Sequence, residues 1–148
     1  MLDFDISTLP TPCYVTDERL LVKNLEILKS VQDRTGCKIL LAQKAFSMYS
    51  TYPLISKYLA GTTASGLFEA KLGKEEMPEG ETHVYAPAYS EKYFAEIVTV
   101  ADHIVFNSFA QWKRFKPLVK QAEAERGIEI ECGLRLNPEH SEGAVPIY

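Results

Sequence analysis

The sequence predicts an α/β fold of parallel strands, most simply the amino-terminal part of a (β/α)8 TIM-like barrel. Five short apolar stretches have the composition of buried strands, and segments with helical periodicity lie between them. The strands recur at intervals of roughly twenty to twenty-six residues, the spacing of right-handed βαβ units. A doubly wound sheet shares this spacing. The strands are expected at residues 37–43, 61–64, 82–86, 103–107 and 129–136.

The first expected helix precedes the strand series and runs through Arg34. Asp17 is a good N-cap residue, and Gly36 follows where a left-handed C-cap is wanted. Between them, apolar side chains recur on one broad stripe that suits packing against a sheet. The stripe contains Leu20, Leu21, Leu25, Ile27, Leu28 and Val31.

The remaining helices are expected between the strands. Ser108 and Gln111 have the spacing of a capping box and open a helix toward Arg126, which Pro117 is expected to kink or interrupt. Further helical segments fill the gaps at residues 49–60, 67–72 and 91–100.

The fifth strand favours the barrel over the doubly wound sheet. Its apolar residues suit a helix layer on one face, while the other face carries Arg135 near the carboxyl end. An inward guanidinium needs an anionic partner, and the mouth of a barrel usually supplies one. The alternative is that Arg135 pairs with a nearby glutamate for structure only. The alternating sets are Ile130, Cys132, Leu134 and Leu136 against Glu129, Glu131, Gly133 and Arg135.

Lys44 lies at the carboxyl end of the first expected strand. A lysine amine attacks an aldehyde only when neutral, and partial burial at the mouth of an apolar core lowers its pKa. Lys44 is therefore a candidate for covalent chemistry with a carbonyl group. The alternative is a strand-end lysine that lays its stem on the core and keeps its charge in water.

Composition bounds the remaining functions. A net charge of −4 and a pI near 5.4 give no electrostatic reason to expect nucleic acid or anionic lipid as a partner. No stretch is long enough to span a membrane, no signal peptide is visible, and a cytoplasmic location is expected. Cys13, Cys37 and Cys132 are expected to be reduced thiols. No metal site is predicted, because one would have to be assembled from histidines and carboxylates at distant positions.

Five segments together resemble the carboxynorspermidine/carboxyspermidine decarboxylases. These are fold type III pyridoxal-phosphate enzymes, related to alanine racemase, ornithine decarboxylase and diaminopimelate decarboxylase. The resemblance implies a pyridoxal-phosphate-dependent carboxy-lyase that converts carboxynorspermidine or carboxyspermidine to norspermidine or spermidine in polyamine biosynthesis. The segments are Thr11-Pro12-Cys13-Tyr14-Val15, residues 39–46, residues 61–65, Val105-Phe106-Asn107-Ser108 and residues 134–142.

The resemblance also assigns site residues. Lys44 matches the lysine that binds pyridoxal 5'-phosphate covalently, and Arg135 matches an arginine near the cofactor ring oxygen. Ser65 falls in a segment that lines the cofactor pocket, with Glu69 just beyond it. Asn107, Ser108 and Asn137 fall at carboxyl ends of strands, where a turn or cap role is the favoured interpretation.

The chain is short for this family. A complete barrel needs eight strands, so residues 1–148 are expected to form a partial cofactor-binding barrel domain, inactive by itself. The phosphate loop, the proton donor, the rest of the barrel and a C-terminal β domain are expected from the remainder of the enzyme or a companion chain. A homodimer and a small polyamine carboxylate substrate are expected. The alternatives are another decarboxylase of the fold, of diaminopimelate or ornithine type, and a non-catalytic barrel fragment.

Overall fold

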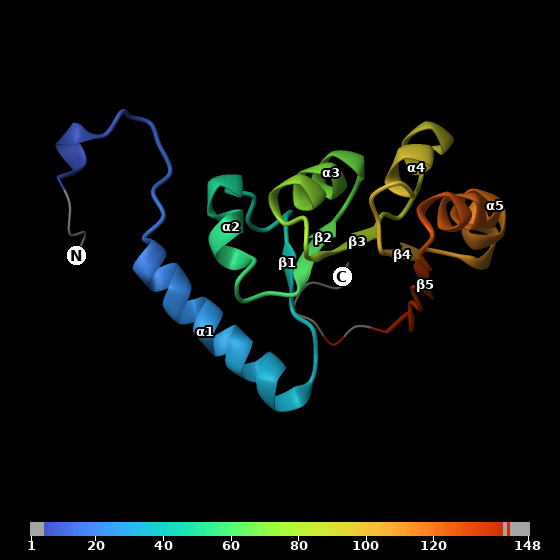
Figure 1. The fold of residues 1–148 in the computed structure, drawn as a ribbon, viewed down its shortest axis with the longest axis horizontal. Helices are drawn as coiled ribbons and strands as arrows, with labels where there is room; N and C mark the ends of the chain where they lie inside the picture. The colour runs from blue at the N-terminus through green and yellow to red at the C-terminus, as the bar shows by residue number, and fades with distance from the viewer. Residues whose placement is uncertain (1–4, 141, 143–148) are drawn as a thin grey trace.

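A computed structural model describes residues 5–140 and 142, and within them five parallel strands form one sheet in sequence order (Figure 1). The strands are β1 (Leu40–Ala42), β2 (Gly61–Ala64), β3 (Glu81–Tyr85), β4 (His103–Phe106) and β5 (Glu131–Leu134). The helices are η1 (Ile6–Thr8), α1 (Glu18–Thr35), η2 (Tyr49–Thr51), α2 (Tyr52–Ile55), α3 (Leu67–Glu76), α4 (Glu91–Ile97) and α5 (Phe109–Arg126). The predicted α/β fold and the order of its elements are confirmed.

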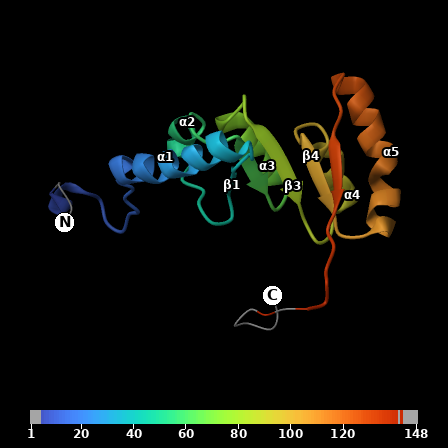
Figure 2. The same ribbon diagram turned by 90° about the horizontal axis from the view of Figure 1, so that it is seen from below.

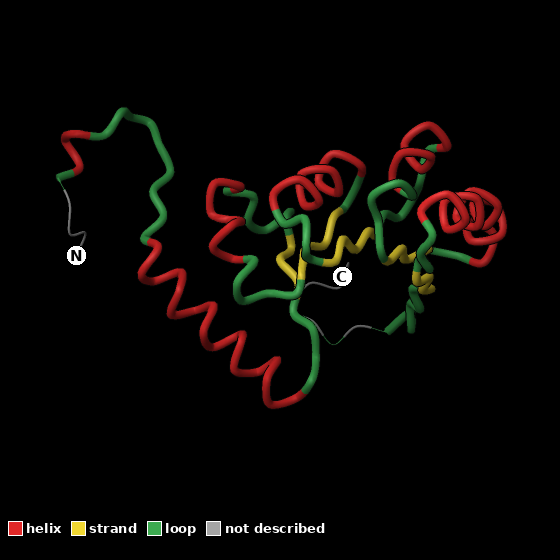
Figure 3. The backbone as a smooth tube through the Cα atoms, viewed as in Figure 1, coloured by secondary structure: helices red, strands yellow, loops and turns green. Residues whose placement is uncertain are grey.

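The two faces of the sheet differ in what covers them. Helices α3, α4 and α5 lie along one face, and in Figure 2 they lie on the same side of the strands. We call the other side, which bears Thr63, His83 and His103, the open face. Parallel register places these three side chains in one row across β2, β3 and β4, because Thr63 pairs with His83 and His83 with His103. Figure 3 shows no helix directly opposite α3, α4 and α5 across the strands, while α1 lies beyond the β1 end of the sheet.

The core lies between the sheet and the helices. Val84, Ile104 and Phe106 point from the strands toward Phe94 and Phe115, and each is at most 2% exposed. Burial of side chains of this size stabilises the fold by roughly 1.5–3 kcal/mol each. A second cluster joins α1 and α2 to the sheet and contains Leu25, Tyr52, Ile55, Leu59 and Met77.

The ends of α1 are as predicted, but its apolar stripe is only partly covered. Asp17 accepts a hydrogen bond from the Arg19 N–H, and Gly36 has a left-handed φ of 72°. Leu25 is buried, whereas Leu20 and Ile27 are 58% and 63% exposed. Helix α1 packs against the sheet only at the β1 edge. Its apolar stripe is wider than the surface that this packing covers. Only part of the predicted stripe is therefore covered among the described residues.

Helix α5 departs from expectation at Pro117. The helix runs continuously from Phe109 to Arg126, so the predicted interruption is wrong. Pro117 leaves the Lys113 carbonyl without its helical partner. Both residues are exposed, and water can solvate that carbonyl.

The apolar face of strand β5 is less buried than the alternation of apolar and polar residues predicted. Ile130 is buried at 3% exposure, but Cys132, Leu134 and Leu136 are exposed. The expected helix layer over these three side chains is absent from the described part of the chain, because α5 packs over β4 and β5 is the last strand there. Among the described helices, none has the length and apolar character needed to cross a membrane.

Candidate active site

Lys44 occupies a tight turn that follows β1 directly. The N–H groups of Ala45 and Phe46 donate to the Ala42 carbonyl at 2.9 and 3.2 Å, which closes the turn around Lys44. The side chain is exposed, so the expected partial burial is not found. The physical reason is the open sheet: no described segment faces β1 from across the open face. The position at the carboxyl end of the strand is as predicted.

The neighbouring Gln43 fixes the turn from beneath. It is 1% exposed, and its amide nitrogen donates to the Glu69 carbonyl at 2.9 Å. Its amide oxygen accepts from the Tyr52 hydroxyl at 3.3 Å, and burial raises the pKa of Tyr52, which keeps the phenol a donor. The backbone beside Lys44 is thus anchored to α3 and α2.

Ser65 and Glu69 form a second small unit at the carboxyl end of β2. The Ser65 backbone N–H donates to the Glu69 carboxylate at 2.5 Å, and the charge lies in the first turn of α3, where the helix dipole favours it. Both residues line a shallow hollow of about 320 Å³ with Phe68 and Tyr93. Since Gln43 bonds the Glu69 carbonyl, this unit and the Lys44 turn are joined.

Arg135 follows β5 and reaches across the open face. Its Nη1 donates to the Tyr85 hydroxyl at 2.5 Å, and its guanidinium carbon lies 5.3 Å from the centre of the Tyr85 ring. The Tyr85 hydroxyl in turn donates to the Asn107 side chain at 3.0 Å. Tyr85 shares the open face with His83, two residues earlier on β3, so Arg135 lies on this face and not among the helices. In the described part of the chain its recorded partner is Tyr85 rather than a glutamate.

The other polar residues at strand ends have structural contacts. Ser108 accepts a hydrogen bond from the Gln111 N–H and caps α5, while the Gln111 side chain reaches back to the Asn107 N–H at 2.7 Å. The Asn137 side chain accepts from the Glu139 N–H at 3.0 Å. The favoured cap and turn interpretations of Ser108 and Asn137 agree with these contacts.

A hollow of about 610 Å³ lies beside the Lys44 turn. It is lined by residues 14–16 and 45–48. The Thr16 hydroxyl contacts the Met48 sulfur at 2.8 Å, which joins the two walls. Neither Lys44 nor Arg135 lines this hollow. The structure brings Lys44, Ser65 and Glu69 into one connected unit and places Arg135 with Tyr85 further along the sheet.

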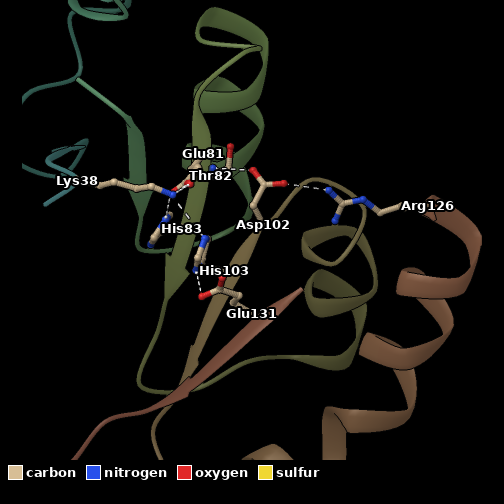
Figure 4. A network of polar contacts seen from close by, with 8 residues as sticks. All are labelled: Lys38, Glu81, Thr82, His83, Asp102, His103, Arg126 and Glu131. Atoms are coloured by element: carbon tan, nitrogen blue, oxygen red, sulfur yellow. Dashed lines mark hydrogen bonds and ion pairs between the residues drawn. The ribbon is translucent and has the colours of Figure 1, made fainter. Parts of the chain in front are cut away.

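Sequence reasoning missed a polar network toward the amino-terminal ends of the strands (Figure 4). Glu81 is bonded to Lys38 and His83, and the His83 and His103 rings stack with centroids 3.8 Å apart. Burial alone would raise the pKa of Glu81, but the hydrogen bonds from Lys38 and His83 outweigh it and lower the pKa. Alternation could have shown that Glu81 and His83 share a face, but the pairing with His103 requires the register of β3 and β4.

A second part of that network ties a helix to the sheet. Arg126 donates to the carbonyls of Val98 and Ala101 at 2.8 and 2.6 Å and lies 3.3 Å from the Asp102 carboxylate. Asp102 accepts in turn from the Thr82 N–H at 2.9 Å. These contacts hold the end of α5 to β3 and β4 and are structural.

Fold and site define a class: an α/β protein with a parallel sheet in sequence order and a lysine just beyond its first strand. No family model matches the sequence. The chain is 38% identical over 143 residues to a carboxyaminopropylagmatine decarboxylase of Synechocystis. It is 41% and 40% identical to carboxynorspermidine/carboxyspermidine decarboxylases of Campylobacter jejuni and Herminiimonas arsenicoxydans. These matches cover 97%, 93% and 86% of this chain and 35%, 34% and 33% of the relatives.

A solved structure agrees with the sequence matches. The carboxynorspermidine decarboxylase of C. jejuni, complexed with norspermidine, superimposes with a TM-score of 0.73 at 42% identity, covering 76% of this chain and 30% of that one. The chain is therefore a homologue of the carboxynorspermidine/carboxyspermidine decarboxylases. It spans about a third of the length of the curated relatives it matches.

Proposed function

We propose that this chain is the lysine-bearing part of a pyridoxal-phosphate-dependent decarboxylase of polyamine biosynthesis, acting on carboxynorspermidine or carboxyspermidine. The carrying observation is Lys44 in a turn just beyond β1, anchored by the buried Gln43, in a chain homologous to decarboxylases of these substrates. The class of reaction is proposed from the relatives' names, and the residue roles are proposed from the family resemblance.

The residues present suit pyridoxal 5'-phosphate. The exposed Lys44 amine is free to reach an aldehyde, with which it would form the covalent link as water leaves. Arg135 presents a guanidinium on the open face, oriented by Tyr85, and would donate to an oxygen of the ring. When bound, the cofactor supplies an electron sink for the charge that remains after carbon dioxide departs.

Ser65 and Glu69 are proposed to line the cofactor pocket. The Glu69 carboxylate accepts from the Ser65 backbone N–H, and both residues follow β2, the strand that pairs with β1 just before the Lys44 turn. Their hydrogen bonds support a role in shaping the pocket wall. The rest of the barrel, the phosphate loop and the proton donor are proposed to come from the remaining length of the enzyme, with a homodimer as the assembly.

One observation favours a second substrate. The Synechocystis relative is named for carboxyaminopropylagmatine, which ends in a guanidinium where carboxynorspermidine ends in an amine. Both substrate types therefore enter the test.

The test uses the full-length protein loaded with pyridoxal 5'-phosphate. Borohydride reduction followed by peptide mapping is expected to place the cofactor on Lys44. Lys44→Ala should abolish labelling and decarboxylation, while Lys57→Ala, which removes another exposed lysine, should retain both. Cofactor found on Lys57, Lys71 or Lys74 would overturn the assignment.

Carbon dioxide release then identifies the substrate. We expect turnover of carboxynorspermidine or carboxyspermidine well above that of ornithine and diaminopimelate. A preference for carboxyaminopropylagmatine would establish the second candidate, and a preference for ornithine or diaminopimelate would refute both.

A further inference from the structure

We propose that Glu81, His83 and His103 form a binding site for a divalent transition metal of the zinc class. The site is separate from the proposed cofactor pocket, because Glu81 and His103 begin β3 and β4 whereas Lys44 and Arg135 follow the carboxyl ends of their strands. All three side chains are about a quarter exposed in the described part of the chain.

The ligand atoms already lie at coordination spacing. The Glu81 Oε2 atom is 3.0 Å from His83 Nε2 and 3.6 Å from His103 Nε2. One ligand atom from each of the three residues lies within 4.8 Å of the other two. Ligands at zinc bond lengths in a tetrahedral site are about 3.4 Å apart, so the two distances bracket that value. Two imidazoles and one carboxylate, with a fourth position left for water, suit zinc better than calcium or magnesium, which prefer oxygen ligands.

Glu131 orients one of the ligands. Its carboxylate lies 3.2 Å from His103 Nδ1, at the paired position on the neighbouring strand. In the neutral ring this contact places the proton on Nδ1 and leaves the lone pair of Nε2 facing Glu81. The His103 Nε2 lone pair and the Glu81 carboxylate are then two acceptors that face each other, and a cation between them stabilises this arrangement. A carboxylate behind the ligating histidine is the usual partner in metal sites.

Three features must change when an ion binds. His83 donates to Glu81 from Nε2, so the proton on that nitrogen must move to Nδ1 before Nε2 can bind an ion. Lys38 already pairs with the Glu81 carboxylate through Oε1, so its ammonium competes with the metal. The histidine rings are stacked with an interplanar angle of 16°, and parallel rings cannot both direct lone pairs at one ion. His103 is held by Glu131, so we infer that His83 turns about its Cβ–Cγ bond to open the stack.

The test measures zinc binding to full-length protein with no affinity tag, stripped of metal, in competition with a chromophoric chelator. One zinc ion per chain is expected. Glu81→Gln, His83→Gln and His103→Gln should each weaken binding by tenfold or more, and Glu131→Gln by about tenfold. His140→Gln is the matched control, since it removes an exposed histidine outside the cluster and should change nothing. Thermal unfolding of each variant without metal checks that the fold is retained.

Lys38→Met gives the sharpest discrimination. Loss of the competing ammonium should tighten zinc binding several-fold, whereas a purely structural Lys38–Glu81 pair predicts no gain. Cobalt substitution should give the visible absorption of a four-coordinate nitrogen and oxygen site. Absence of stoichiometric zinc binding, or binding that survives His83→Gln together with His103→Gln, would overturn the proposal; if either variant fails to fold, Lys38→Met and the cobalt spectrum still decide.

Discussion

Tyr85 and Arg135 hold each other across the open face, with β4 between them. The guanidinium donates to the phenol oxygen at 2.5 Å and lies over the ring, 5.3 Å from its centre. The same hydroxyl donates to Asn107 at 3.0 Å. Three strands therefore cooperate to place one guanidinium, although Arg135 itself follows the least covered strand.

Tyr85→Phe should loosen Arg135 without removing it. The ring contact remains, but both hydrogen bonds of the hydroxyl are lost, a change of about 1 kcal/mol at an exposed site. We expect pyridoxal 5'-phosphate to bind about fivefold more weakly to the full-length protein, as measured by absorbance titration. Tyr58→Phe, in the second core cluster, is the control and should bind normally. Unchanged affinity in Tyr85→Phe would remove the positioning role.

Gly61 and Gly66 make a matched pair for a test of stability. Gly61 has φ of 158°, and an added Cβ would lie 2.0 Å from the Glu81 backbone oxygen. Gly61→Ala should therefore lower the free energy of unfolding by about 3 kcal/mol or more, because backbone must move. Gly66 is extended with open space around its Cα, so Gly66→Ala should cost about 1 kcal/mol or less. Urea unfolding of both variants measures the difference, and equal losses would contradict the packing of β2 on β3.

Ionisation of the buried Tyr89 phenol should lower the free energy of unfolding at alkaline pH. Its hydroxyl donates to the Val105 carbonyl at 2.9 Å and accepts from the Ala86 N–H at 3.1 Å, and burial raises the pKa of Tyr89 to about 12. The unfolded value is about 10, so the folded state holds this proton more tightly. Its contribution is complete below about pH 10 and is lost as pH rises toward 12.

Tyr89→Phe isolates the contribution of the Tyr89 hydroxyl to the free energy of unfolding. The variant should lose about 1–2 kcal/mol at neutral pH, since the buried Ala86 N–H is left without its partner. It should also show a shallower loss of stability between pH 10 and 12 than the parent. Unfolding by urea at several alkaline pH values measures both effects, with Tyr14→Phe as the control at a 97% exposed tyrosine. Parallel pH profiles for parent and Tyr89→Phe would show that this phenol does not cause the loss of stability at alkaline pH.

Local signals were sufficient for most of the fold. Asp17, Gly36 and Ser108 act at helix ends as their residue types predict, and all five strands form where apolar runs recur. The interruption predicted at Pro117 does not occur. The free energy that a proline costs inside a helix depends on whether water solvates the carbonyl left without a partner, and a sequence does not show this. The exposure of part of the α1 stripe could not be predicted, because amphipathicity shows which side of a helix is apolar and not how much of that side is buried.

The candidate site was predictable only in part. Lys44 and Arg135 stand at ends of apolar strands, a pattern visible in the sequence. The Tyr85 contact and the cluster of Glu81, His83 and His103 depend on the pairing of separate strands, which no local pattern encodes. Gln43 was expected only as a strand residue, although its buried amide joins the lysine turn to α3.

The order of the sheet bears on how the chain assembles during synthesis. Every strand pairs with the one made immediately before it, about twenty to thirty residues earlier. A ribosome needs on the order of seconds to add each such unit, while closing a local β/α unit takes far less time. The sheet can therefore grow strand by strand as it emerges, with each new strand docking on a finished template. A slow codon cluster placed between two of these five strands should then have little effect on how they pair.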